Sequence, residues 1–216
     1  MRITFLRMAS VICALMLANL ANAIEQPVLV VDQNGNPVIN AVIAFKALPS
    51  EVDNTGVAIM DQINKQFSPQ VIAIQKGQAV KFPNSDDIRH HVYSFSAIKP
   101  FEIKLYKGSN VDPIIFDKPG IGILGCNIHD QMTGHVYVAD NEHVAVTNEK
   151  GVATFVRDIP DEVSVWHSDL SIDGTHKITA TIDRSDAGAI VHITLIERKP
   201  KEEQRTFGKR TFGRQN

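Results

Sequence analysis

The chain has 216 residues, which is enough for one or two domains with a buried core. Its formal net charge of −2 argues against a molecule built to bind nucleic acid or an acidic substrate over its whole surface. Hydrophobic residues make up 44% of the chain, an ordinary globular value that argues against wholesale disorder.

The first 23 residues have the pattern of a secretory signal peptide. Arg2 and Arg7 form a basic start, residues 8–20 are apolar, and Ala21-Asn22-Ala23 is a small-residue cleavage site. The alternative is a membrane anchor, which the short apolar run disfavours. We therefore expect residues 1–23 to be removed, the mature protein to be periplasmic, and no transmembrane segment to remain.

The segment 24–54 predicts a strand, a turn and a second strand. The strands are expected at 28–31 and 38–45, separated by the turn sequence D-Q-N-G-N-P at 32–37. The pattern V-x-D-x-x-G-x-P-V-x-x-A-V resembles the start of the carboxypeptidase regulatory-like modules, which are small transthyretin-like β-sandwiches. The polar stretch 49–56 is a candidate domain boundary.

The segment 55–139 predicts an all-β domain made of short strands. The strands are expected at 71–74, 79–82, 90–95, 101–106, 113–116, 121–124 and 135–139. The run 101–106 alternates clearly, with Phe101, Ile103 and Leu105 on one face. The only helix expected is a short one around Asp61 to Gln66.

The segment 140–197 again shows the pattern of short strands and turns found in the segment 24–54. Its pattern T-x-x-x-G-x-A-x-F followed by I-P resembles the second half of a regulatory-like module, although Pro160-Asp161-Glu162 replaces the usual Pro-Gly. We infer that the domain at 55–139 is inserted into a β-sandwich whose two parts flank it. The alternative is two unrelated hairpin segments packed on one domain.

The last segment, 198–216, is rich in Lys, Arg, Gln and Gly and carries the repeat R-T-F-G. Its low hydrophobicity predicts a disordered basic tail. Such a tail serves solubility in the simplest interpretation, and weak contact with an anionic membrane surface or a partner is the alternative.

The sequence G-C-N-I-H-D-Q-M-T-G at 125–134 places Cys126, His129 and Met132 at three-residue intervals. Thiolate and thioether ligands favour copper over hard cations, and two histidines, one cysteine and a weak axial methionine form a blue-copper site. Once the signal is removed, Cys126 is the only cysteine. A structural zinc site is the alternative, disfavoured because zinc sites are built from further Cys or His rather than Met.

The second histidine lies upstream, in the run V-K-F-P-N-S-D-D-I-R-H-H-V at 80–92. This run, followed by C-x₂-H-x₂-M, resembles the cupredoxins over residues 67–139, and the loop spacing is closest to amicyanin. The whole chain resembles exported bacterial plastocyanin-like proteins labelled methylamine-utilisation-like.

The resemblance implies a Greek-key β-sandwich that holds one type 1 copper ion. It assigns His90, Cys126, His129 and Met132 as metal ligands. His91 occupies a position where the family usually has an asparagine that braces the ligand loop, and it is the alternative to His90, since neighbours on a strand point to opposite faces. Asn84 matches a loop asparagine of the family and is a candidate for contact with the thiolate or its neighbours.

Three functions follow for comparison. The first is a non-catalytic one-electron carrier with a cytochrome or oxidoreductase as redox partner. The second is a copper-binding assembly, sensing or delivery protein whose flanking module binds a partner. The third, ranked last, is a multicopper enzyme, which would need further copper centres. We therefore predict that the protein is not an enzyme.

Overall fold

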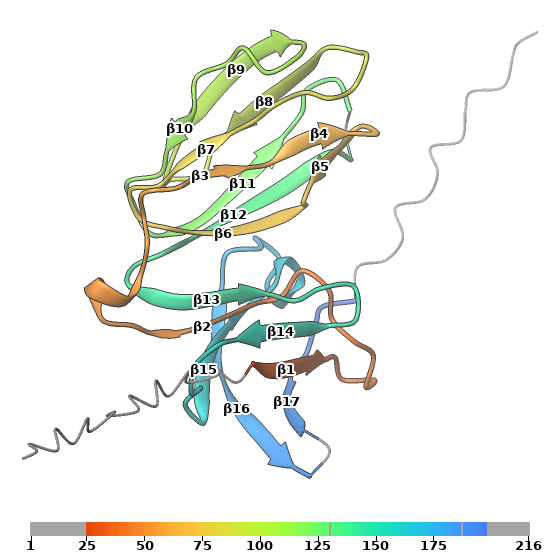
Figure 1. Cartoon of the computed structure of the whole chain (residues 1–216). Helices are drawn as coiled ribbons and strands as arrows, with labels where there is room; N and C mark the ends of the chain where they lie inside the picture. Colours follow the sequence, from red (N-terminus) through yellow and green to blue (C-terminus); the bar gives the residue numbers. More distant parts are fainter. Residues whose placement is uncertain (1–24, 130, 187, 198–216) are drawn as a thin grey trace, which may run out of the picture.

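The computed structural model describes residues 25–129, 131–186 and 188–197, and this part of the chain is all β (Figure 1). Within these ranges there is no α-helix, and the only helical segments are two short 3₁₀ turns at Pro49–Glu51 and Ser168–Leu170. None of the described helices is long and apolar enough to cross a membrane. The predicted signal peptide and the predicted basic tail lie outside the described residues.

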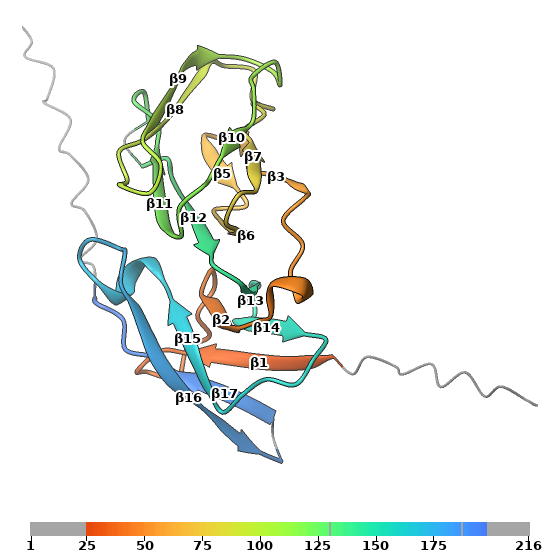
Figure 2. The same cartoon turned by 90° about the vertical axis from the view of Figure 1, so that its left-hand side faces the viewer.

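One sandwich is formed by the middle of the chain. Its larger sheet has the strand order β6 (Val71–Gln75), β12 (Thr133–Ala139), β11 (Gly120–Gly125), β8 (His90–Ser94), β9 (Phe101–Tyr106). Facing it are the sheet β10 (Ile114–Ile115), β7 (Ala79–Lys81), β3 (Val57–Ile59) and the hairpin β4 (Asp61–Ile63), β5 (Gln66–Ser68) (Figure 2). A buried cluster that includes Phe82, Phe116, Leu124 and Val136 fills the space between them.

The alternation of strand β12 shows how this sandwich is joined to the rest of the molecule. Val136 and Val138 point into the core of the middle sandwich. Tyr137 and Ala139 point the opposite way, into a second buried cluster that also contains Trp166. Because successive side chains of a strand face opposite sides, β12 is buried on both faces.

The remaining strands form a seven-stranded sheet. Its order is β13 (Glu142–Val146), β2 (Val42–Lys46), β15 (Glu162–Trp166), β16 (Lys177–Ser185), β17 (Gly188–His192), β1 (Gln26–Val31), β14 (Val152–Phe155). Strand β16 pairs first with β15 and then with β17, and one core gathers residues from both ends of this sheet. The strands therefore come from before and after the middle sandwich. This membership favours the predicted insertion, which stays a prediction.

Most predicted strands are present, but the expected helix at Asp61–Gln66 is wrong. These residues form the β4–β5 hairpin, in which Ile63 pairs with Gln66 across the turn residues Asn64 and Lys65. Both turn residues have positive φ, 54° and 60°, as a two-residue type I′ hairpin turn requires. The turn is also bonded to a distant loop, which no local pattern reveals. The strand expected from residue 38 begins only at Val42.

Candidate metal centre

The candidate ligands are brought together by two neighbouring strands and one loop. His90 is the first residue of β8, and Cys126 directly follows β11. The two strands pair through Tyr93 and Gly125. His129 lies in the loop that connects β11 to β12, so residues 36 positions apart in the chain meet at one end of the sandwich.

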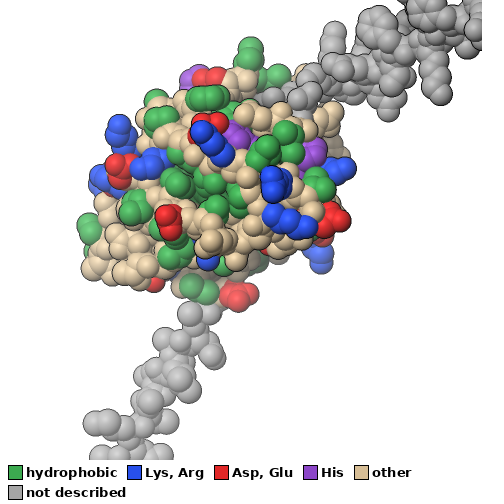
Figure 3. Space-filling model, turned by 90° about the horizontal axis from the view of Figure 1, so that it is seen from above, with side chains coloured by type: hydrophobic (Ala, Val, Ile, Leu, Met, Phe, Trp, Pro, Cys, Tyr) green, Lys and Arg blue, Asp and Glu red, His purple; other side chains and the backbone are tan. Residues whose placement is uncertain are grey.

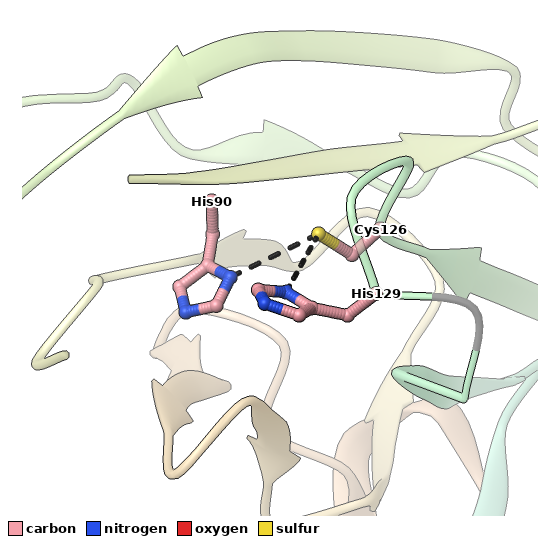
Figure 4. A group of neighbouring side chains, drawn as sticks. All are labelled: His90, Cys126 and His129. Carbon is pink, nitrogen blue, oxygen red and sulfur yellow. Dashed lines mark hydrogen bonds between the residues drawn. The ribbon is translucent and has the colours of Figure 1, made fainter. Parts of the chain in front are cut away.

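The donor atoms converge as a metal site requires (Figure 4). The Nδ1 atom of His90 and the Nδ1 atom of His129 each lie 3.8 Å from Sγ of Cys126. The ligand atoms of these three residues all lie within 4.8 Å of one another, and no other such group occurs among the described residues. A metal about 2.0–2.3 Å from each donor, the usual length of metal–nitrogen and metal–thiolate bonds, fits between the sulfur and either nitrogen at the 3.8 Å spacing.

Met132 lies in the same core cluster as Cys126 and is 1% exposed. Its backbone N–H donates to the carbonyl of His129 at 3.0 Å, which closes the ligand loop into a tight turn. Two imidazoles and one thiolate, with a buried thioether in the same core, are the donor set of blue copper. The centre has the donor set of a type 1 copper site. The resemblance to the cupredoxins is thereby confirmed at the site itself.

No family model and no curated protein matches the sequence. Among solved structures, the chain is similar to a purple cupredoxin from Nitrosopumilus maritimus, at 20% identity and a TM-score of 0.35 over 38% of this chain and 99% of that one. It is similar to a reduced amicyanin variant at 20% identity and a TM-score of 0.36 over 46% of this chain and 99% of that one.

A copper-containing nitrite reductase from Thermus scotoductus matches at 22% identity and a TM-score of 0.38, over 51% of this chain but 28% of that one. All three TM-scores are below 0.5, so the assignment of the copper site rests on its own residues.

His90 is fully buried, and the ring nitrogen that does not face Cys126 has a carboxylate partner. Its Nε2 atom lies 2.7 Å from a carboxylate oxygen of Asp86. Burial acts to raise the pKa of Asp86, but hydrogen bonds from the N–H of Lys65 and from His90 outweigh it, and the pKa lies below the ordinary 3.8. An ionised carboxylate at Nε2 places the proton there and leaves Nδ1 free to bind metal.

The sequence singled out Asn84 and His91 rather than Asp86. The only available signal was an acidic residue four positions before the histidine, within a loop whose path is set by distant contacts. Asp86 is thus the site residue that sequence reasoning missed.

His91 points away from the copper site. Its Nε2 atom lies 2.9 Å from a carboxylate oxygen of Glu102, on the next strand of the sheet. The side-chain amide of Asn84 donates to the carbonyls of Ile88 and Tyr106, both at 2.9 Å. These bonds shape the loop that leads to His90 and do not reach the thiolate. The structure thus places His90, and not His91, beside Cys126.

His129 is the partly exposed histidine of the pair. Its ring lies 4.9 Å, centroid to centroid, from the ring of His90. Burial lowers the pKa of His129, and the neighbouring His90 and Lys65 lower it further. The preceding residue, Ile128, is 49% exposed. Seen from above, the molecule shows apolar side chains and histidines together with Lys, Arg, Asp and Glu side chains (Figure 3).

Proposed function

We propose that this protein is an exported, periplasmic one-electron carrier. In this proposal His90, Cys126 and His129 are the three close ligands of a type 1 copper ion, and Met132 is its weak axial ligand. The observation that carries the proposal is the placement of two imidazole Nδ1 atoms at 3.8 Å from a single buried thiolate sulfur. Copper bound there would take up and release one electron.

The chain's own residues would hold the ligands still in both redox states. His90 is fully buried and Cys126 is 4% exposed, so the β-scaffold surrounds both. Met132 is 1% exposed in the same core. Closely packed protein interiors resist movement, which suits a metal site whose ligands must not rearrange when the metal changes charge.

In this proposal, electrons enter and leave the copper site through the ring of His129. His129 is the least buried of the three ligands, and Ile128, the residue before it in the chain, is 49% exposed. An exposed apolar side chain next to a partly exposed ligand suits brief docking of a redox protein. We expect a cytochrome or an oxidoreductase as the partner.

The test is voltammetry of the copper-loaded chain from Ile24 onward. The proposal predicts one reversible one-electron couple and rapid electron exchange with a small cytochrome. Cys126→Ser is the control, since it removes the thiolate and keeps the volume of the side chain. An irreversible couple, or exchange no faster than with the Cys126→Ser protein, would contradict the carrier function.

A second candidate function is copper-dependent assembly, sensing or delivery. The seven-stranded sheet favours it, because a minimal electron carrier does not need this additional sheet. We propose that the sheet is the transthyretin-like module into which a Greek-key cupredoxin domain, residues 55–139, is inserted. Tight binding of a partner that survives Cys126→Ser would favour this function over electron transfer.

An enzyme of the multicopper kind remains the last candidate. One group of His, Cys and acidic residues suited to a metal occurs in the described ranges. Copper titration decides between the two classes: one ion per chain supports the carrier, and a higher stoichiometry would revive the enzyme.

A further inference from the structure

The β4–β5 hairpin is bonded along its length to the loop that precedes His90. The N–H of Gln62 donates to the carbonyl of Pro83 at 3.1 Å, and the N–H of Ser85 donates back to the carbonyl of Gln62 at 3.1 Å. The carboxylate of Asp61 accepts two further bonds from Ser85, from its N–H at 3.1 Å and its hydroxyl at 2.7 Å. These bonds fix the hairpin against the loop.

The tip of the hairpin holds the carboxylate of Asp86. The N–H of Asn64 donates to one oxygen at 2.7 Å, and the N–H of Lys65 donates to the other at 2.9 Å. Both donors point the same way because both residues have positive φ, which a non-glycine residue rarely adopts. Successive N–H groups in a turn form a concave site for an anion. Here the anion is a side chain of the same protein.

The carboxylate of Asp86, held by the turn, in turn contacts the ring of His90. The oxygen that accepts from Lys65 also lies 2.7 Å from Nε2 of His90. A hydrogen bond at Nε2 fixes the tautomer and orientation of the ring, and Nδ1 of the same ring is the atom that faces Cys126. The side chain of Asp86 is 14% exposed and that of His90 is fully buried, so little water competes for this bond.

We propose that the type I′ turn at Asn64 and Lys65 is a positioning device for the copper site. It orients the carboxylate of Asp86, which sets the tautomer and the angle of the His90 ring before the metal arrives. Asn64 and Lys65 act through their backbone, and Asp86 acts through its side chain. This inference rests on the proposed assignment of His90 as a ligand.

The first test compares Asp86→Ala with Asp87→Ala. Both variants remove one negative charge from the same loop, but Asp87 is exposed and makes no hydrogen bond to His90. We expect Asp86→Ala to weaken copper binding about 10- to 100-fold and Asp87→Ala to change it less than about twofold. Equal affinities of the two variants would overturn the proposal.

The second test compares Lys65→Gly with Lys65→Val. Both remove the lysine charge and keep the backbone N–H, but glycine tolerates a φ of 60° and a β-branched residue does not. We expect Lys65→Gly to bind copper as the wild type does. Lys65→Val should displace the donor and weaken binding while the far-UV circular dichroism stays unchanged. Identical affinities would overturn the role of the turn.

The third readout needs no copper. Nitrogen-15 NMR of the histidine rings in the metal-free protein should show a single Nε2–H tautomer for His90, and a mixture of tautomers in Asp86→Ala. An unchanged tautomer in Asp86→Ala overturns the positioning role even if the copper site stands. If instead the wild type binds no copper, the proposed function fails while this readout still tests the positioning device.

Discussion

At the scale of single residues, the copper site combines one fully buried and one partly exposed imidazole. The carboxylate of Asp86 lies at hydrogen-bond distance from Nε2 of His90. The main effect on His129 is burial, which lowers its pKa. The neutral imidazole binds metal, so a lowered pKa keeps His129 ready for copper in more acidic solution. The two ligands are therefore prepared by different means.

The pH dependence of the metal-free protein follows from His129. Its pKa in the folded state is below 6.5, so the unfolded chain binds more protons as the pH falls through 6.5. The contribution of this residue to stability is complete above 6.5, is lost progressively below it, and stops changing below the folded-state pKa. Proton NMR titration of the metal-free protein should give a midpoint for His129 below 6.5. A midpoint at or above 6.5 would contradict this account.

Gly125 shows how closely the strands pack behind the thiolate. A Cβ atom at this position would lie 2.6 Å from the ring of Tyr93, which no ordinary contact allows. We expect Gly125→Ala to lower the free energy of unfolding by about 1–3 kcal/mol and to alter the visible spectrum of the copper form, since Cys126 is the next residue. Gly56→Ala is the control, because the nearest atom to its Cβ lies at 3.8 Å. Equal stabilities in chemical denaturation would contradict the packing argument.

At the scale of elements, Thr147 ties the end of β13 to the loop before β2. Its hydroxyl is buried, accepts from the N–H of Ala41 at 2.8 Å and donates to the carbonyl of Val38 at 2.7 Å. Both partners lie more than 100 residues before Thr147 in the chain. The bond therefore joins the segments before and after the middle sandwich.

Replacement of Thr147 by valine keeps the shape and removes both bonds. It leaves a buried N–H and a buried carbonyl without this partner, so we expect a loss of about 1–3 kcal/mol in urea denaturation. Thr175→Val removes an exposed hydroxyl bond, to Asp173 at 2.8 Å, and should cost less than about 0.5 kcal/mol. Equal costs for the two variants would mean that Thr147 does not join the segments.

The strands and the copper motif could largely be predicted from the sequence, because both are local patterns. The run 101–106 matches β9 in extent, and Phe101 and Ile103 face the core as predicted. Leu105, predicted on the same face, is instead 51% exposed. Tyr106 packs against the core in its place, because the pairing of β8 with β9 shifts register between His90 and Val92. His90, Cys126 and His129 were predicted from spacing and resemblance, and the structure brings them together. The partners of these residues could not be predicted in the same way.

The β4–β5 hairpin illustrates the reason. Asn64 and Lys65 occupy positive φ without glycine, supported by the carboxylate of Asp86, which lies 22 and 21 residues away from them in the chain. The short run around them carries no clear strand alternation, and a helix was expected there instead. Propensity is a weak guide where tertiary hydrogen bonds decide the backbone conformation.

At the scale of the whole molecule, one buried cluster joins the two groups of sheets. Trp166 from β15 and Tyr137 from β12 lie in this cluster, and both are fully buried. The indole N–H of Trp166 donates to the carbonyl of Gly174 at 3.0 Å. Each group of sheets buries part of its apolar surface against the other in this cluster. The chain also passes between the two groups twice.

We predict that the molecule unfolds as one unit. Trp166→Ala should lower the free energy of unfolding by about 3–5 kcal/mol, although Trp166 is not a copper ligand. Circular dichroism and the visible band of the copper form should be lost at the same, lowered temperature. Two separate transitions, with the copper band unaffected by the substitution, would show that the middle sandwich and the seven-stranded sheet unfold independently.

In the proposed function, His90, Cys126 and His129 hold one type 1 copper ion. The most direct measurement is copper titration of the chain from Ile24 onward, followed by optical and EPR spectra. The account predicts one copper per chain, an intense thiolate-to-copper absorption band and a narrow copper hyperfine splitting, all lost in His90→Ala and retained in His91→Ala. A copper-loaded protein without this band, or a band that survives His90→Ala and disappears in His91→Ala, would contradict it.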